Sequence, residues 1–181
     1  MDFKNIISHL LAAFQKHNIR YALMGGFAIG LWGGSRATVD LDFLVSLDDI
    51  EKIDTIMLGL GYDCRHKSEN VSQYISPLRV LGEVDFLHAF REASVGMLER
   101  SELKDIFDGE IKIRTLIPED IIGLKLQAIK NNPKRLAIDT EDIKTLLYLR
   151  AEKTDWLLIE KYCAILDMRS VFDELKRSME Q

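Results

Sequence analysis

Two short blocks of sequence, Leu23-Met24-Gly25-Gly26 and Asp40-Leu41-Asp42-Phe43, are separated by thirteen residues, 27–39. The first block closes a short apolar run, which predicts a buried strand that ends in a tight turn. Residues 27–32 predict a short helix after that turn. The second block lies in the alternating run 38–45, which predicts another strand. The order expected here is therefore strand, glycine turn, helix, strand.

The second predicted strand carries two carboxylates on one face. Successive side chains of a strand point to opposite faces, so Asp40 and Asp42 point the same way while Leu41 and Phe43 anchor the other face in the core. Two convergent carboxylates suit a hard divalent cation, and Mg²⁺, which accepts phosphate oxygens as further ligands, fits well. The pattern predicts a metal site that works on a phosphate compound.

The glycine pair has a matching role. Without Cβ atoms, the backbone at Gly25 and Gly26 allows a ligand to approach closely, and the helix that begins near Phe27 offers free N–H groups to a phosphate. A plain tight turn is the alternative reading of the two glycines.

A third carboxylate, Asp85, lies in a later predicted strand that ends in residues 83–87. If this strand pairs beside the one that carries Asp40 and Asp42, three carboxylates face one space and two metal ions fit there. The alternative for Asp85 is a solvated carboxylate on a half-exposed strand.

The remaining sequence predicts an α/β (α+β) fold: a small mixed sheet flanked by helices, with a helical region at the C-terminal end. Apolar spacing indicates helices over residues 3–18 (with Asp2 as N-cap), 50–60 (after a capping box at 46–49), 121–129, 142–149, 156–166 and 171–179, strands at 71–75 and 78–87, and a hairpin turning at Asp108-Gly109. We expect two domains, residues 1–115 and residues 116–181.

Composition limits the function classes. The chain has 181 residues and a net charge of −5, with 47% hydrophobic and 29% charged residues, so a packed core is expected and a general nucleic-acid coat protein is disfavoured. Cys64 and Cys163 form no CxxC pair, and the start of the chain has neither a signal peptide nor an apolar run long enough for a membrane. We expect a cytoplasmic protein with no membrane association.

The two blocks resemble the signature of the DNA polymerase β-type nucleotidyltransferase superfamily, in which a hydrophobic-Gly-Gly/Ser segment precedes Asp-hydrophobic-Asp-hydrophobic. Asp85 is similar to the third carboxylate of that superfamily. Arg36-Ala37-Thr38 resembles a form found in small stand-alone bacterial members. Lys125-Leu126-Gln127-Ala128, together with Asp139-Thr140-Glu141-Asp142, resembles a helical segment of the AbiEii-type toxin nucleotidyltransferases.

The resemblance implies transfer of a nucleoside monophosphate from an NTP to a hydroxyl acceptor, with release of pyrophosphate. It implies that Asp40, Asp42 and Asp85 are catalytic and hold Mg²⁺, with two ions expected. It further implies that Gly25, Gly26, Arg36 and Lys125 bind the nucleotide phosphates. The acceptor implied is tRNA, a protein or a small molecule, and an antitoxin is an expected partner.

Two other functions stay open. One is an antibiotic-modifying nucleotidyltransferase that acts on an aminoglycoside or a lincosamide, which the acidic net charge favours. The other is a catalytically silent module that binds nucleotide or a partner protein.

Overall fold

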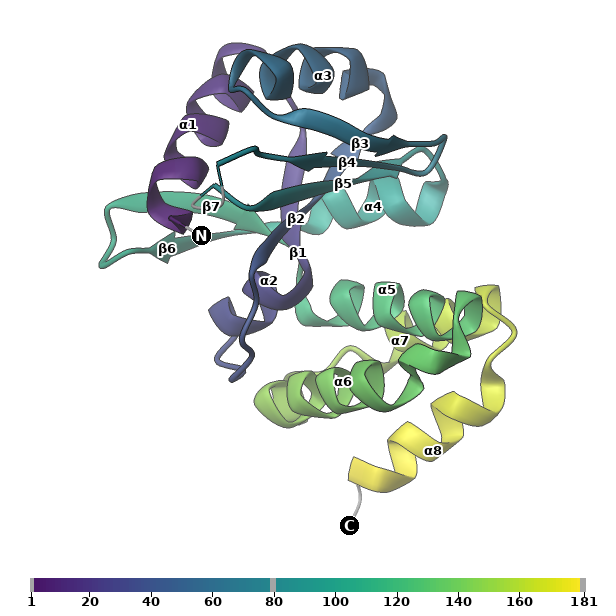
Figure 1. The fold of residues 1–181 in the computed structure, drawn as a ribbon. Helices are drawn as coiled ribbons and strands as arrows, with labels where there is room; N and C mark the ends of the chain where they lie inside the picture. Colours follow the sequence, from purple (N-terminus) through teal and green to yellow (C-terminus); the bar gives the residue numbers. More distant parts are fainter. Residues whose placement is uncertain (1, 79–80, 180–181) are drawn as a thin grey trace. The chain divides into compact units, whose positions relative to one another are not determined.

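The computed structural model describes residues 2–78 and 81–179. The chain forms two compact units, one of Met1–Leu31 with Arg36–Leu116 and one of Trp32–Ser35 with Ile117–Gln181. Figure 1 shows a sheet flanked by helices in the first unit and only helices and connecting turns in the second. The predicted α+β class is confirmed. The predicted domain division, a core of residues 1–115 and a C-terminal helical region of residues 116–181, remains our proposal.

The first unit is built on one seven-stranded mixed sheet with strand order β3-β4-β5-β2-β1-β7-β6. Its strands are β1 (Tyr21–Met24), β2 (Asp40–Ser46), β3 (Asp63–Lys67), β4 (Val71–Ile75), β5 (Glu83–Ala89), β6 (Glu102–Ile106) and β7 (Ile111–Thr115). Its helices are α1 (Phe3–Lys16), α2 (Gly25–Leu31), α3 (Ile50–Gly59) and α4 (Glu92–Arg100), with a 3₁₀ turn at Leu47–Asp49.

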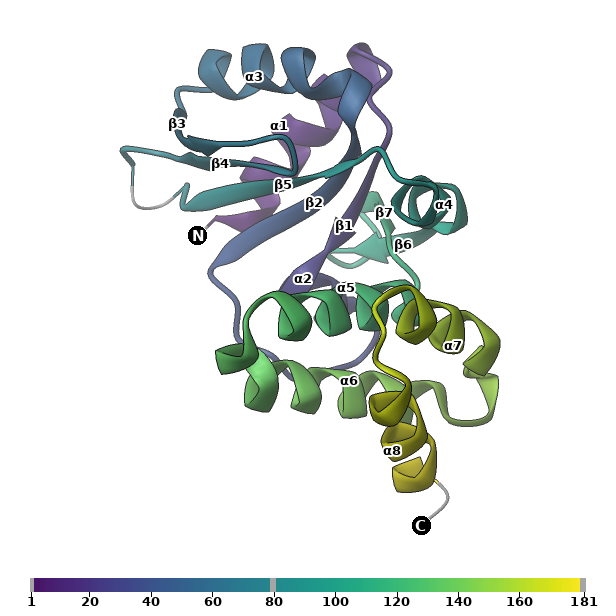
Figure 2. The same cartoon turned by 90° about the vertical axis from the view of Figure 1, so that its right-hand side faces the viewer.

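One face of this sheet is the apolar core. Phe43 on β2 and Phe86 on β5 stack with ring centroids 5.8 Å apart, and Phe14 of α1 packs edge-on against both. Helix α3 covers the same face, since its Asp54 accepts a hydrogen bond from the hydroxyl of Tyr74 on β4 (Figure 2). The placement of the alternate residues of β2 in this core, predicted from the sequence, is confirmed: Leu41 and Phe43 are fully buried.

The second unit contains α5 (Pro118–Asn131), α6 (Leu136–Arg150), α7 (Trp156–Ile165) and α8 (Arg169–Met179), with 3₁₀ turns at Pro133–Arg135 and Ala151–Lys153. These helices confirm the helical region predicted from the sequence. Helices α5 and α7 approach closely at Gly123, where an added Cβ would lie 2.6 Å from the ring of Tyr162.

Residues 32–35 belong to the helical unit although they precede β2 in the chain. The guanidinium of Arg150 lies over the ring of Trp32 at 5.6 Å, and an added Cβ at Gly33 would touch Leu149 at 3.4 Å. Arg150 in turn donates a hydrogen bond from Nε to the buried carboxylate of Glu119 at 3.2 Å. The sequence analysis did not anticipate this grouping.

Four local features differ from the sequence expectations. Strand β3 and helix α4 were not predicted, and β5 begins at Glu83 rather than at Leu78. Residues 79–80 of that predicted strand lie outside the described residues. The capping box at 46–49 is wrong: the Ser46 side chain makes no cap hydrogen bond, because its hydroxyl accepts one from Arg20 Nη2 at 3.0 Å and the turn becomes 3₁₀.

Candidate active site

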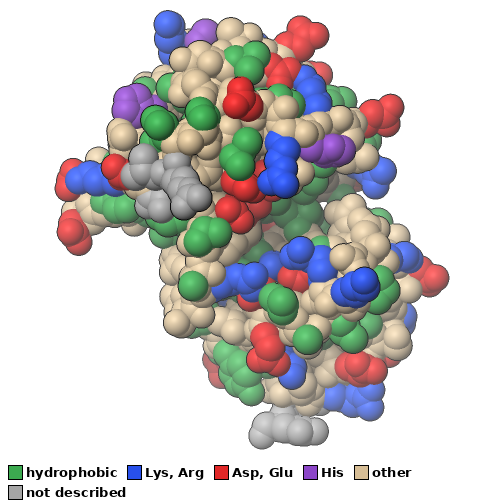
Figure 3. Space-filling view, viewed as in Figure 1, with side chains coloured by type: hydrophobic (Ala, Val, Ile, Leu, Met, Phe, Trp, Pro, Cys, Tyr) green, Lys and Arg blue, Asp and Glu red, His purple; other side chains and the backbone are tan. Residues whose placement is uncertain are grey.

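The face of the sheet opposite the core carries a row of carboxylates. Strands β2 and β5 pair in parallel, with Asp42 opposite Asp85 and Asp40 opposite Glu83. Paired residues of neighbouring strands point to the same side, so all four acidic side chains share what we call the carboxylate face. Figure 3 shows acidic side chains gathered on this unit beside a basic one.

The expectation that the strand of Asp85 lies beside the strand of Asp40 and Asp42 is therefore met by the observed register. All three are half-buried. A parallel pair of this kind joins residues far apart in the chain, and no local pattern in the sequence determines its register.

Asp85 is held by one oxygen only. Its Oδ2 accepts a hydrogen bond from Nε2 of Gln73 on β4 at 2.8 Å. Its Oδ1 is buried and has no hydrogen-bond partner among the described residues. A buried carboxylate oxygen without a donor is costly, so this atom is suited to an additional ligand.

Burial raises the pKa of Asp85, and the charges of Asp40 and Glu83 raise it further. The Gln73 hydrogen bond and the positive charge of Arg65 oppose this rise in the pKa. Burial likewise raises the pKa of Asp40, with a second contribution from Glu83. Burial is therefore the main cause of both rises in pKa, and the neighbouring negative charges add to it.

Gly25 allows Asp42 to lie against the backbone. A Cβ added at Gly25 would stand 2.0 Å from Oδ2 of Asp42, which is well inside van der Waals contact. Gly25 also has a φ of +69°, a conformation that residues with side chains rarely adopt. Gly25, the first glycine of the sequence pattern, therefore contacts Asp42, its second aspartate.

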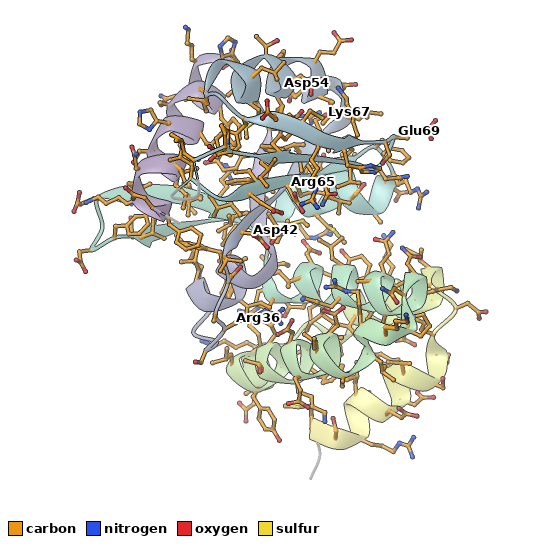
Figure 4. The ribbon with its side chains drawn as sticks, in the orientation of Figure 1. Arg36, Asp42, Asp54, Arg65, Lys67 and Glu69 are labelled. Carbon is orange, nitrogen blue, oxygen red and sulfur yellow. The ribbon has the colours of Figure 1, made fainter. Side chains whose placement is uncertain are left out.

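Gly26 has a corresponding contact on the other side of the turn. An added Cβ would stand 3.0 Å from Cβ of Thr38 and 3.4 Å from Nε of Arg36. Thr38 is hydrogen-bonded to the start of β2, because its hydroxyl donates a hydrogen bond to the Asp40 carbonyl at 3.2 Å. Arg36 therefore lies beside the glycine turn in the sheet unit; Figure 4 labels both Arg36 and Asp42.

The donor set of the carboxylate face fits a hard divalent cation, because Asp40, Asp42 and Asp85 supply oxygen ligands and Asp85 Oδ1 lacks a partner. The side chains are not yet gathered as ligands. Within residues 2–78 and 81–179, no three His, Cys, Asp or Glu side chains stand close enough together to hold a metal ion.

Lys125 lies in the other unit, on α5. Its Nζ is 2.8 Å from Oδ1 of Asp139 and 2.6 Å from Oδ2 of Asp142, both on α6, and the group is buried. Arg135 also pairs with Asp139 at 2.7 Å. The segments that resemble the toxin family in the sequence thus meet as one ion-pair cluster of the helical unit. Lys125 belongs to the helical unit, whereas Asp40, Asp42 and Asp85 belong to the sheet unit.

A family described as nucleotidyl transferase AbiEii toxin, type IV TA system, matches residues 9–162 of this chain. The chain belongs to this family. As an AbiEii-family protein it is a nucleotidyltransferase, and the resemblance seen in the sequence is confirmed. No curated protein sequence matches the chain. No helix in the described part of this AbiEii-family chain is both long and apolar enough to cross a membrane.

Solved structures of antibiotic nucleotidyltransferases share the fold. The solution structure of the antibiotic-resistance factor ANT(2'')-Ia has a TM-score of 0.67 at 19% identity and covers 99% of each chain. Its crystal structure with adenylyl-2''-tobramycin has a TM-score of 0.66 at 18% identity, covering 92% of this chain and 97% of that one. The lincomycin-bound lincosamide adenylyltransferase LnuA has a TM-score of 0.57 at 14% identity, covering 80% and 96%.

Two residues of the carboxylate face were missed in the sequence of this AbiEii-family member. Gln73 reaches Asp85 only through the β4–β5 pairing, and Glu83 joins the face through its register with Asp40. The signal for Glu83 was present, because it stands two positions before Asp85 in the predicted strand. No signal in the sequence pointed to Gln73.

Proposed function

We propose that the carboxylate face is the catalytic site of this nucleotidyltransferase and that it transfers a nucleoside monophosphate from an NTP to a hydroxyl, releasing pyrophosphate. The proposal rests chiefly on the Asp42–Asp85 register, which brings together carboxylates from two strands. The buried Oδ1 of Asp85, which has no hydrogen-bond partner among the described residues, supports it, because this atom is available to a ligand.

Asp40, Asp42 and Asp85 are the residues that would hold Mg²⁺, and we propose two ions. When bound, Mg²⁺ neutralises charge on the triphosphate and on the reacting oxygens. The protein contributes positioning: Gly25 keeps the Asp42 carboxylate against the backbone, and β2 presents Asp40 on the same side. These contacts orient the ligands before substrate arrives.

Asp85 is the residue we assign to the acceptor hydroxyl. Its Oδ1 would hold a metal ion near that hydroxyl, and the positive charge there would favour loss of the hydroxyl proton. A half-buried position beside other acids suits a carboxylate that binds a divalent cation.

For the phosphates we propose Gly25 and Gly26 as the turn that the nucleotide approaches, and Arg36 as the cation beside it. The position of Arg36 near Gly26 supports this role, since an arginine fork binds phosphate oxygens in pairs. The sequence-based assignment of Lys125 as a further phosphate cation remains a proposal, although its Nζ is buried in the helical unit and pairs with Asp139 and Asp142.

The acceptor we propose is tRNA, as the sequence resemblance to the toxin nucleotidyltransferases implies, and the family description as a toxin of type IV toxin–antitoxin systems is compatible with a cellular acceptor of this kind. On the same ground we propose an antitoxin as partner and the cytoplasm as the place of action. A cationic small molecule is the second candidate. The four carboxylates of the carboxylate face favour it, and ANT(2'')-Ia, which shares the fold, has been solved with adenylyl-2''-tobramycin.

The test is transfer of label from each of the four NTPs, with Mg²⁺ or with EDTA, to total tRNA, to an aminoglycoside and to a lincosamide. Asp42→Asn and Asp85→Asn should each lower transfer at least about a hundredfold, since both remove a charged group from the site. Asp63→Asn, an exposed carboxylate on β3, is the matched control and should retain activity.

Transfer that survives both substitutions in folded protein would refute the site. The labelled acceptor identifies the substrate class directly. NTP binding by calorimetry without transfer to any acceptor, and without pyrophosphate release, would indicate a nucleotide-binding module instead.

A further inference from the structure

The hydrogen bond between Gln73 and Asp85 can form only between particular atoms of the two side chains. An ionised carboxylate only accepts hydrogen bonds, whereas a glutamine side chain has both a donor and an acceptor end. At 2.8 Å from Asp85 Oδ2, the glutamine atom must be Nε2, because its Oε1 at that distance would place two acceptors against each other. The pair therefore fixes which oxygen of Asp85 is occupied.

Gln73 holds this position through the backbone of the sheet. It is the Cα partner of Asp85 in the antiparallel β4–β5 ladder, and the ladder is continuous from Val71 to Ile75. The β3–β4 ladder pairs the same residue with His66 on its other side. A donor anchored between two strands has little freedom to move, so the carboxylate that it binds is also restrained.

The consequence is an asymmetric carboxylate. Oδ2 of Asp85 is engaged by Gln73, while Oδ1 is buried without a partner. Without the amide, rotation about χ2 would exchange the two oxygens, since this torsion is broad for aspartate. With the amide, one oxygen is held in place as the open one.

We propose that Gln73 is a positioning residue that presents Asp85 Oδ1 as the ligating oxygen of the carboxylate face. This inference rests on the proposed function, because it requires that Asp85 bind the divalent cation. Gln73 acts through Asp85 and touches neither substrate nor metal. Outer residues of this kind commonly contribute about 10–100-fold to metal affinity.

The test uses Gln73→Met, which keeps the length of the side chain and removes the donor. Binding of Mg²⁺ and Mn²⁺ to the full chain is measured by calorimetry, alongside the melting temperature and the NTP transfer rate. We expect the metal Kd of Gln73→Met to rise about tenfold or more. Gln15→Met, at an exposed position on α1, is the matched control and should bind metal as the wild type does.

Two further measurements separate positioning from a structural role. Gln73→His, which restores an N–H donor, should recover most of the metal affinity. In ¹H–¹⁵N spectra the Gln73 side-chain amide, assigned by its loss in Gln73→Met, should shift when Asp85 is changed to Asn and again when Mg²⁺ is added. A loss of stability alone would not produce this response.

The failures are distinguishable. If wild type and Gln73→Met bind metal within twofold of each other, while Asp42→Asn abolishes binding, the role of Gln73 is refuted and the proposed function stands. If the wild type binds no divalent cation at all, even with NTP present, the metal-dependent function and this inference fall together.

Discussion

Replacing Gly25 with Ala tests the link between backbone and catalysis most directly. The new methyl would stand 2.0 Å from Oδ2 and 2.7 Å from Cγ of Asp42, at a φ of +69°. Two of the atoms that it meets belong to the carboxylate, which can rotate away, whereas Asp42 Cβ at 2.9 Å can move only with a small shift of the backbone. The site then loses the orientation of Asp42.

The expected costs differ greatly between stability and activity. The left-handed backbone conformation costs about 1–2 kcal/mol for alanine, which lowers the melting temperature of a chain of this size by about 2–8 °C. Displacing a carboxylate by about 1 Å or more lowers the rate about a hundredfold or further. Gly25→Ala should therefore stay folded and lose its transfer activity.

The assay is labelled NTP transfer at a temperature well below the melting point, with circular dichroism to verify folding. Gly30→Ala is the matched control: it changes a glycine of the same helix, α2, and its added Cβ meets nothing within 4 Å. Folded Gly25→Ala with a rate within threefold of Gly30→Ala would refute the argument that Gly25 positions Asp42.

Two other predictions concern the rest of the chain. Lys125→Met leaves the buried carboxylates of Asp139 and Asp142 without their shared cation and should cost about 3 kcal/mol of unfolding free energy. Lys144→Met, at a partly exposed position on α6, should cost less than about 0.5 kcal/mol. Chemical denaturation measures both, and equal losses would contradict the buried pairing. Burial lowers the pKa of His88 below its usual 6.5, so the unfolded chain binds this proton at a higher pH than the folded chain does. The free energy of unfolding should therefore fall by up to about 1.4 kcal/mol per pH unit as the pH drops from 6.5 to the folded-state pKa. An equally steep fall in His88→Gln would show that another group is responsible.

Local sequence patterns predicted most of the fold because the elements concerned bury a regular set of side chains. Helix α1 begins after the Asp2 cap as expected, where the carboxylate accepts a hydrogen bond from the Asn5 amide at 3.2 Å. The hairpin at Asp108-Gly109 also formed as predicted, with Ile106 opposite Ile111. In both cases the determining contacts lie within a few residues of each other.

The elements that were missed lack such a pattern. Strand β3 lies at the edge of the sheet with all five residues exposed, so it shows no alternation of apolar and polar residues. Helix α4 buries only Met97 and Leu98, and adjacent residues give no helical period.

The candidate site likewise combines features that nearby residues determine with features that depend on tertiary strand pairing. The order of glycine turn, short helix and aspartate-bearing strand was predicted from the sequence, whereas the contact between Gly25 and Asp42 was found only in the structure. The roles of Gln73 and Glu83 depend on how β4, β5 and β2 align, which only tertiary pairing determines. The engagement of Ser46 by Arg20 likewise replaced a local cap with a longer-range contact.

The parallel pairing of β2 with β5 also constrains when during folding the chain becomes active. Asp42 and Asp85 are partners across a separation of 43 positions, so their contact closes a long loop and belongs to the slower, non-local part of the folding reaction. A chain emerging from the ribosome with β1 and β2 complete contains both glycines and two aspartates, yet it lacks Asp85. The chain should therefore become active only after β5 has paired with β2, and we expect no transfer activity from any species in which β5 is unpaired.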